Sequence, residues 1–154
     1  METICLTISA GSGPEECAYA AALTLKILQK ELKEQKDSDI TIRIIETEPS
    51  CVKGNIRSAL LMLEGKEARF YADSWMGIIQ WIWHSAYRPH HKRKNWFVSV
   101  KPYIEPEAEK SFSPSDLRQS YWELERGNPI RVYDGETLKL LKRNSSQKGV
   151  KQNV

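Results

Sequence analysis

The hydrophobic period of the chain changes twice within its first 44 residues, and these changes restrict the folds that the chain can adopt. Residues 3–8 alternate apolar and polar side chains, which is typical of a strand with one buried face. Over residues 14–36 the apolar side chains instead recur at steps of three and four, which predicts an amphipathic helix. Residues 40–44 alternate again. The chain therefore begins with a strand, a helix and a second strand.

The segment SAGSGPEEC, between the first predicted strand and the first predicted helix, allows two interpretations. A glycine-containing turn before a helix N-terminus can bind phosphate. This segment has no Gly-Lys-Ser/Thr motif, and Glu15 and Glu16 place two negative charges where a phosphate would lie. We favour a structural turn in which Ser12 caps the helix and forms a capping box with Glu15.

A third strand, residues 59–65, and a short helix, residues 68–75, follow the second strand. The helical spacing of the apolar residues also fits one long helix over residues 66–83. However, Gly77 interrupts this pattern, and the segment IIQWIW after it consists largely of residues that fit a pleated strand better than a helix. We therefore predict a strand at residues 78–84.

Strands at residues 78–84 and 95–103 would form a β-hairpin. A further apolar stretch, residues 130–133, is a candidate edge strand. In chain order, the main elements are a strand, a helix, two strands, a helix and two strands. This order predicts an α+β fold with a ferredoxin-like βαββα core and an added β-hairpin. Both helices would cover one face of an antiparallel or mixed sheet.

The loop of this hairpin lies in a strongly basic stretch, SAYRPHHKRKNW, residues 85–96. No acidic residue occurs between Asp73 and Glu105. Such a loop repels itself unless an anionic group lies opposite it. Lysine and arginine beside aromatic residues on a projecting element suit RNA phosphates and unpaired bases. The candidate RNA-binding residues are Arg88, His90, His91, Lys92, Arg93, Lys94 and Trp96.

The same residues have other interpretations. A solvated loop or a localisation-type charge cluster would explain the cations without any RNA. Trp96 either stacks on an unpaired base or packs within the hairpin. The histidines of this region are surrounded by cations and have no partner carboxylate nearby in the sequence, which disfavours a metal site. We therefore expect no metal and no cofactor.

The composition narrows the class of protein. Hydrophobic residues make up 40% and charged residues 28%, which excludes a disordered or fibrous chain, and 154 residues suffice for about one domain. No apolar run approaches the roughly 18 residues of a membrane span, so we expect a cytoplasmic protein with no membrane partner. The three cysteines have no paired spacing. The sequence has no pattern typical of a nucleophilic triad, a carboxylate pair or a nucleotide fingerprint, so we expect that this chain is not an enzyme.

Three blocks of the sequence resemble release factor H, the bacterial homologue of the class I peptide chain release factors. They are LTISAGSGPEECAYAAALTLK, GIIQWIWHSAYRPHHKRKNWFVSV and ERGNPIRVYDG, and they cover most of residues 3–133. The resemblance implies that the hairpin loop faces the 16S rRNA decoding centre of the ribosome, near the mRNA. It also implies a role in rescuing ribosomes whose decoding-centre rRNA is cut, with a functional link to an RNA ligase.

The sequence departs from this family in one respect. The catalytic element of the family is a Gly-Gly-Gln loop in a separate domain, whereas all eight glycines of this sequence are isolated. The missing domain would lie near Leu117 and Arg118. We therefore expect a ribosome-recognition domain that is catalytically incompetent as given. The alternatives are a fragment of a release factor that hydrolyses peptidyl-tRNA, and a generic RNA-binding adaptor.

The expected organisation has four parts. Residues 1–104 form the ribosome- and RNA-recognition domain, and residues 105–120 form a connector at the site of the missing catalytic domain. Residues 121–141 form a C-terminal segment that packs back on the same domain. Residues 142–154 form a mobile basic tail.

Overall fold

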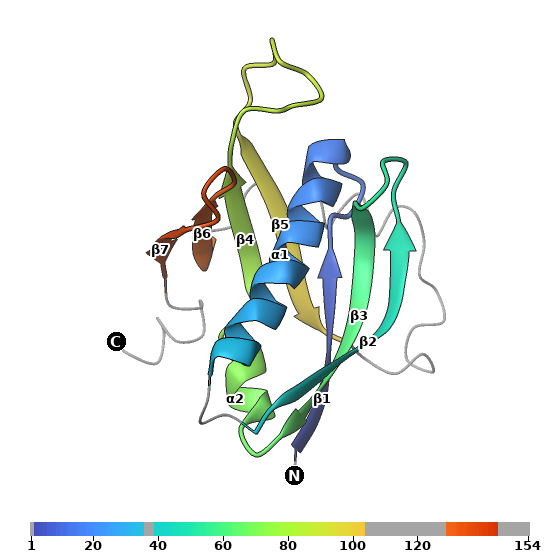
Figure 1. The fold of residues 1–154 in the computed structure, drawn as a ribbon, viewed down its shortest axis with the longest axis vertical. Coiled ribbons are helices and arrows are strands. Elements are labelled where there is room, and N and C mark those ends of the chain that lie inside the picture. The colour runs from blue at the N-terminus through green and yellow to red at the C-terminus, as the bar shows by residue number, and fades with distance from the viewer. Residues whose placement is uncertain (1, 36–38, 104–128, 145–154) are drawn as a thin grey trace.

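The computed structural model describes residues 2–35, 39–103 and 129–144. These residues form one mixed sheet with two helices against it (Figure 1). The elements are β1 (Glu2–Ser9), α1 (Glu15–Glu34), β2 (Thr41–Pro49), β3 (Ile56–Gly65), α2 (Ala68–Asp73), β4 (Gly77–Ile82), β5 (Asn95–Pro102), β6 (Arg131–Asp134) and β7 (Leu140–Arg143). Neither helix in the described part of the chain has the length and apolar character needed to cross a membrane.

The sheet has seven strands in the order β2-β3-β1-β5-β4-β6-β7. Because β3 is antiparallel to both β1 and β2, the latter two run in the same direction with β3 between them. This split β–α–β arrangement is that of a ferredoxin-like core. The β4–β5 hairpin extends the sheet beyond β1, and β6 adds a parallel strand to β4. The predicted α+β fold is confirmed.

Both helices pack against the same face of the sheet. Helix α1 contacts β1, β3 and β5, and α2 contacts β1 and β3 near the C-terminal end of α1 (Figure 1). The buried side chains between them include Leu6, Ile8, Leu28, Leu61, Leu63, Ile79, Trp81, Val98 and Val100. Each fully buried leucine or isoleucine contributes about 1.5–3 kcal/mol, so this layer is the main source of stability.

The chain turns from helix to strand at Gly77, as predicted. Helix α2 ends at Asp73, and Gly77 has a φ of 137°, a conformation that favours glycine. A Cβ atom at this position would lie 3.0 Å from Cγ2 of Ile130. After the glycine, Ile78 pairs with Ser99 across the hairpin. The structure therefore excludes the single long helix over residues 66–83.

The C-terminal strands differ from the prediction. Strand β6 is not an edge strand, because β7 pairs with its outer side. Residues 142 and 143, which were expected in a mobile tail, are the last two residues of β7. Within the predicted C-terminal segment, residues 131–134 form β6 and pair with β4, and residues 140 and 141 belong to β7 on the outer side of β6. The predicted connector, residues 105–120, lies outside the described residues.

Two salt-bridged residues far apart in the sequence fix β6 to the helices. Arg131 is 1% exposed, and its guanidinium donates to the Glu31 carboxylate at 3.3 Å and to the Tyr133 hydroxyl at 3.0 Å. Its Cζ lies 3.7 Å from the centre of the Trp75 ring, a cation–π contact. The Glu31 carboxylate also accepts hydrogen bonds from Tyr71 and Trp75. This network joins α1, α2 and β6.

Replacing Gly77 with alanine should lower the free energy of unfolding by about 1–3 kcal/mol, through backbone strain and the contact with Ile130. Gly54→Ala is the matched control. Gly54 also has a positive φ, of 93°, but a Cβ there would meet no atom within 4 Å. Urea denaturation should therefore show a larger loss for Gly77→Ala than for Gly54→Ala. Equal losses would mean that packing against Ile130 does not matter.

Candidate nucleic-acid interface

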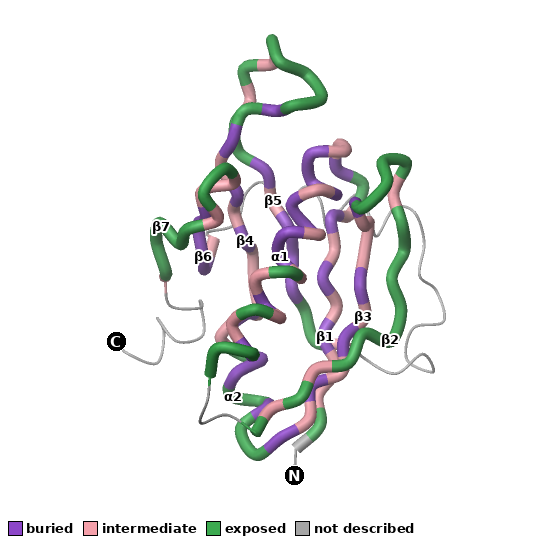
Figure 2. The backbone as a smooth tube through the Cα atoms, viewed as in Figure 1, coloured by how far each residue is buried: buried purple, intermediate pink, exposed green. Residues whose placement is uncertain are grey.

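The basic residues of the hairpin lie on a loop that projects beyond the sheet. We call residues 85–94 the basic loop. It lies at the same end of the molecule as the N-terminus of α1 and the β2–β3 turn (Figure 1), and most of it is exposed (Figure 2). The backbone N–H of Trp83 donates to the carbonyl of Lys94 at 3.0 Å and closes the neck of the loop. The hairpin therefore displays the loop clear of the core.

One end of the basic loop is bound to a buried carboxylate. Nε and Nη2 of Arg88 donate to the two carboxylate oxygens of Glu16 at 2.7 and 2.9 Å, and the Ser85 hydroxyl donates to the same carboxylate at 2.6 Å. Glu16 is 1% exposed. Burial opposes its ionisation, but the hydrogen bonds from Arg88 and Ser85 outweigh burial, so the pKa of Glu16 lies below its ordinary value. The anionic group opposite the loop is thus partly supplied by the protein itself.

Trp96, one of the candidate RNA-binding residues, lies inside the protein, so of its two interpretations the one in which it stacks on an RNA base is wrong. It is 0% exposed, and its indole N–H donates to the carbonyl of Trp83 at 3.0 Å. The guanidinium carbons of Arg93 and Arg88 lie 4.9 and 5.8 Å from its ring centre. The alternative interpretation, that Trp96 packs within the hairpin, is correct. The guanidinium groups of the two arginines thus pack over the Trp96 ring.

The remaining candidate residues fall into two groups. Nε of Arg93 donates to the carbonyl of Asn95 at 2.8 Å, and its backbone N–H donates to Nδ1 of His91 at 3.1 Å. These two residues therefore help to shape the base of the loop. The side chains of His90, Lys92 and Lys94 are exposed. Within residues 2–35, 39–103 and 129–144, neither lysine side chain forms an ion pair. The structure thus separates the candidates into loop-forming and solvent-facing side chains.

A second polar network joins the loop to the β2–β3 turn. The side-chain amide of Asn55 donates to the Glu15 carboxylate at 2.7 Å and to the Tyr87 hydroxyl at 2.8 Å. The Ser50 hydroxyl donates to the other oxygen of Glu15 at 2.8 Å. Burial raises the pKa of Glu15, but these hydrogen bonds and the charge of Arg57 together lower it by more than burial raises it. The pKa of Glu15 therefore lies below its ordinary value. Three chain segments are held together at this end of the sheet.

The predicted capping box at the start of α1 is wrong. Pro14 occupies the N-cap position, without a side-chain cap, and the Glu15 carboxylate is engaged by Ser50 and Asn55. Glu15 and Glu16 instead serve as acceptors for the neighbouring segments. The sequence predicted Glu15 as a capping residue and both carboxylates as an obstacle to phosphate binding, and it gave neither residue a distant partner. The burial of Glu16 could have been inferred from its position. Glu16 lies four residues before Ala20, so the two side chains share the buried face of the helix.

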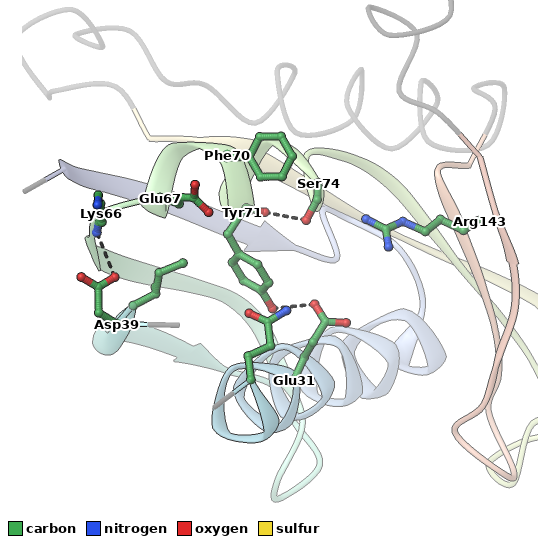
Figure 3. Close-up of a pocket in the computed structure, with 10 residues that line it drawn as sticks. Glu31, Asp39, Lys66, Glu67, Phe70, Tyr71, Ser74 and Arg143 are labelled. Carbon is green, nitrogen blue, oxygen red and sulfur yellow. Dashed lines mark hydrogen bonds between the residues drawn. The ribbon is translucent and has the colours of Figure 1, made fainter. Parts of the chain in front are cut away.

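A separate pocket of about 810 Å³ lies near α2 and the C-terminal end of α1, away from the basic loop. Its lining residues are Glu31, Gln35, Asp39, Ile40, Lys66, Glu67, Phe70, Tyr71, Ser74 and Arg143. The Tyr71 hydroxyl points toward Glu31 and donates to it at 2.7 Å (Figure 3). Burial and the adjacent carboxylate of Glu31 raise the pKa of this tyrosine. The pocket therefore borders the Glu31 network and contains none of the candidate RNA-binding residues.

Replacing Glu16 with glutamine should lower the free energy of unfolding near pH 7 by about 1–2 kcal/mol, because charge-assisted hydrogen bonds to a partly exposed arginine are lost. The folded-state pKa of Glu16 lies below the unfolded value of about 4.3. Its contribution is therefore present above that value and is lost as the pH falls through the folded-state pKa. Denaturation from pH 7 to pH 3 should show a smaller acid-induced loss in the variant than in the wild type.

The Arg88→Gln background provides the control for this experiment. In that background Glu16→Gln should lower the free energy of unfolding by clearly less than in the wild type, because the cation that pairs with Glu16 is absent. Equal costs in the two backgrounds would contradict the assignment of Glu16 and Arg88 as an energetic pair.

No family model matches the chain. It is 42% identical over 108 residues to a peptide chain release factor homolog of Escherichia coli (strain ATCC 25922), a match that covers 70% of this chain and 52% of that protein. The chain thus spans about half the length of the curated relative that it matches.

The fold is similar to that of RF2 of Thermus thermophilus. The TM-score is 0.57 with 17% sequence identity, and the match covers 99% of this chain and 45% of that chain. At this identity the match shows a shared fold only. The sequence match and the shared fold agree with the resemblance found in the sequence blocks. The chain is therefore a relative of the peptide chain release factors, and its predicted resemblance to the release factor homologues is confirmed.

Proposed function

We propose that this chain is a ribosome-directed, cytoplasmic RNA-recognition domain that presents the basic loop to ribosomal RNA. The observation that carries the proposal is the basic loop at the tip of the β4–β5 hairpin, in a chain 42% identical over 108 residues to a release factor homolog. Release factors act on ribosomes, which are assemblies rich in RNA phosphate. A projecting cationic loop suits such a partner.

The contacts with RNA are made by the solvent-facing side chains of the loop. Lys92 and Lys94 are exposed, whereas Nε and Nη2 of Arg88 both donate to the Glu16 carboxylate. An ion pair of this kind reduces the charge that Arg88 offers to a phosphate. Lys92 and Lys94 therefore supply the main phosphate contacts. His90 lies between Arg88 and Lys92 in the sequence, and its side chain is exposed.

The family resemblance supports a more specific role, which we include in the proposal. The basic loop would enter the 16S rRNA decoding centre, close to the mRNA, in ribosomes whose rRNA is damaged. Such a factor would act together with an RNA ligase that repairs the cut. Comparing binding to small ribosomal subunits with intact and with cut decoding-centre rRNA distinguishes this role from that of a generic RNA-binding adaptor, which would not discriminate between them.

Alanine substitution of both Lys92 and Lys94 should weaken binding to small ribosomal subunits and reduce its salt dependence. Each phosphate contact contributes about −0.7 to the log–log slope of affinity against salt, so the slope should flatten by about 1.4. The matched control replaces Lys26 and Lys30, two exposed lysines of α1, with alanine and should leave the slope unchanged. The same slope in wild type and Lys92/Lys94 variant would mean that the loop is merely solvated.

We also propose that the chain does not hydrolyse peptidyl-tRNA by itself, because it has no Gly-Gly-Gln segment to position water at the ester. Purified protein added to ribosomes carrying peptidyl-tRNA should release no peptide above the spontaneous rate. A release factor that contains a Gly-Gly-Gln loop is the positive control. Release above background would instead support the alternative of a hydrolytic factor.

A further inference from the structure

We propose that Tyr87 is the residue on which an unpaired RNA base stacks when the basic loop binds RNA. This inference rests on the proposed function and extends it from phosphate contacts to a base contact. Single-stranded RNA is commonly bound by stacking its bases on exposed aromatic rings beside a cationic surface. Trp96 does not meet this condition, because its ring is fully buried.

Tyr87 is exposed where a stacking residue needs to be. Among the Phe, Tyr and Trp residues that the structure describes, Tyr87 and Phe70 alone are exposed, at 41% and 77%. Phe70 lies on α2, near the opposite end of the sheet from the basic loop, whereas Tyr87 lies within the loop. Tyr87 does not belong to the hydrophobic core cluster. Its ring is therefore an aromatic surface in the same element as Lys92 and Lys94.

The orientation of Tyr87 is fixed at both ends of the residue. Its hydroxyl accepts a hydrogen bond from the side-chain amide of Asn55 at 2.8 Å, and its backbone N–H donates to the Ser85 hydroxyl at 3.1 Å. Asn55 is 5% exposed and is itself held by the Glu15 carboxylate. A ring held in this way loses little conformational entropy when a base binds to it. The buried partners thus preorganise an exposed ring.

The polar partners of Tyr87 also explain why the hydroxyl is directed inward. The hydroxyl reaches a buried amide, while the adjacent residue Arg88 is turned toward Glu16 by its two hydrogen bonds. The cation next to the ring is thereby engaged by the protein. The phosphates that flank a stacked base would then be contacted by the exposed lysines at the other end of the loop.

The test compares Tyr87→Phe with Tyr87→Leu. Both substitutions remove the hydroxyl and its hydrogen bond with Asn55, and both leave an apolar side chain, but only phenylalanine keeps an aromatic face. Stacking contributes about 1–3 kcal/mol per base, so the leucine variant should bind small ribosomal subunits about 5- to 150-fold more weakly than the phenylalanine variant. The salt slopes of the two variants should be equal, because stacking neutralises no phosphate. Equal affinities of the two variants would overturn the proposal.

Two further variants serve as controls for the role of the aromatic ring. Tyr87→Trp retains an aromatic face and should bind at least as tightly as Tyr87→Phe, whereas binding as weak as that of Tyr87→Leu would overturn the proposal. Phe70→Leu removes an exposed aromatic residue outside the loop and should keep wild-type affinity. Thermal unfolding of all the Tyr87 variants, measured in parallel, should give similar midpoints, which excludes loss of the fold as the cause of weak binding.

Failure of this inference is distinguishable from failure of the proposed function. If alanine at Lys92 and Lys94 weakens binding while Tyr87→Phe and Tyr87→Leu bind equally, the loop contacts RNA phosphates without stacking a base. If the wild-type chain does not bind small ribosomal subunits, the proposed function itself fails, and the stacking proposal fails with it.

Discussion

The arrangement of the end of the molecule that carries the basic loop depends on the buried carboxylate of Glu16. A carboxylate that is 1% exposed is costly unless a cation and hydrogen-bond donors satisfy it, and Arg88 and Ser85 do so. Because both donors belong to the basic loop, satisfying the carboxylate also fixes the start of that loop against α1. The neighbouring Glu15 has the same effect on the β2–β3 turn through Ser50 and Asn55. Two adjacent acidic residues thus organise three segments.

This arrangement divides a concentrated positive charge into two parts with different roles. The guanidinium groups of Arg88 and Arg93 lie near the Trp96 ring and engage carboxylate or carbonyl oxygens, so they stabilise the shape of the loop. Lys92 and Lys94 face solvent and keep their charge available. The contacts of the two arginines with oxygen atoms reduce the repulsion among the cations. The positive electrostatic potential is retained at the two lysines, where a phosphate would bind. The RNA contacts of the proposed function would therefore be made by a preorganised loop.

The parts of the structure that follow from local patterns were predictable, whereas those set by distant contacts were not. The changes of hydrophobic period predicted β1, α1 and β2, and the glycine at position 77 predicted the end of α2. The pairing of Arg88 with Glu16 spans 72 positions, so neither residue alone indicated it. Strand β7 was missed because its four residues are all exposed and show no alternation. The burial of Trp96 was detectable, because it alternates in phase with Val98 and Val100.

The proposed function requires that the solvent-facing lysines of the basic loop bring the chain to the decoding-centre rRNA. Chemical footprinting of 16S rRNA in small ribosomal subunits tests it most directly. The wild-type protein should protect decoding-centre nucleotides, and alanine at both Lys92 and Lys94 should abolish this protection. Protection confined to other regions of the rRNA, or unchanged protection by the double variant, would contradict the claim.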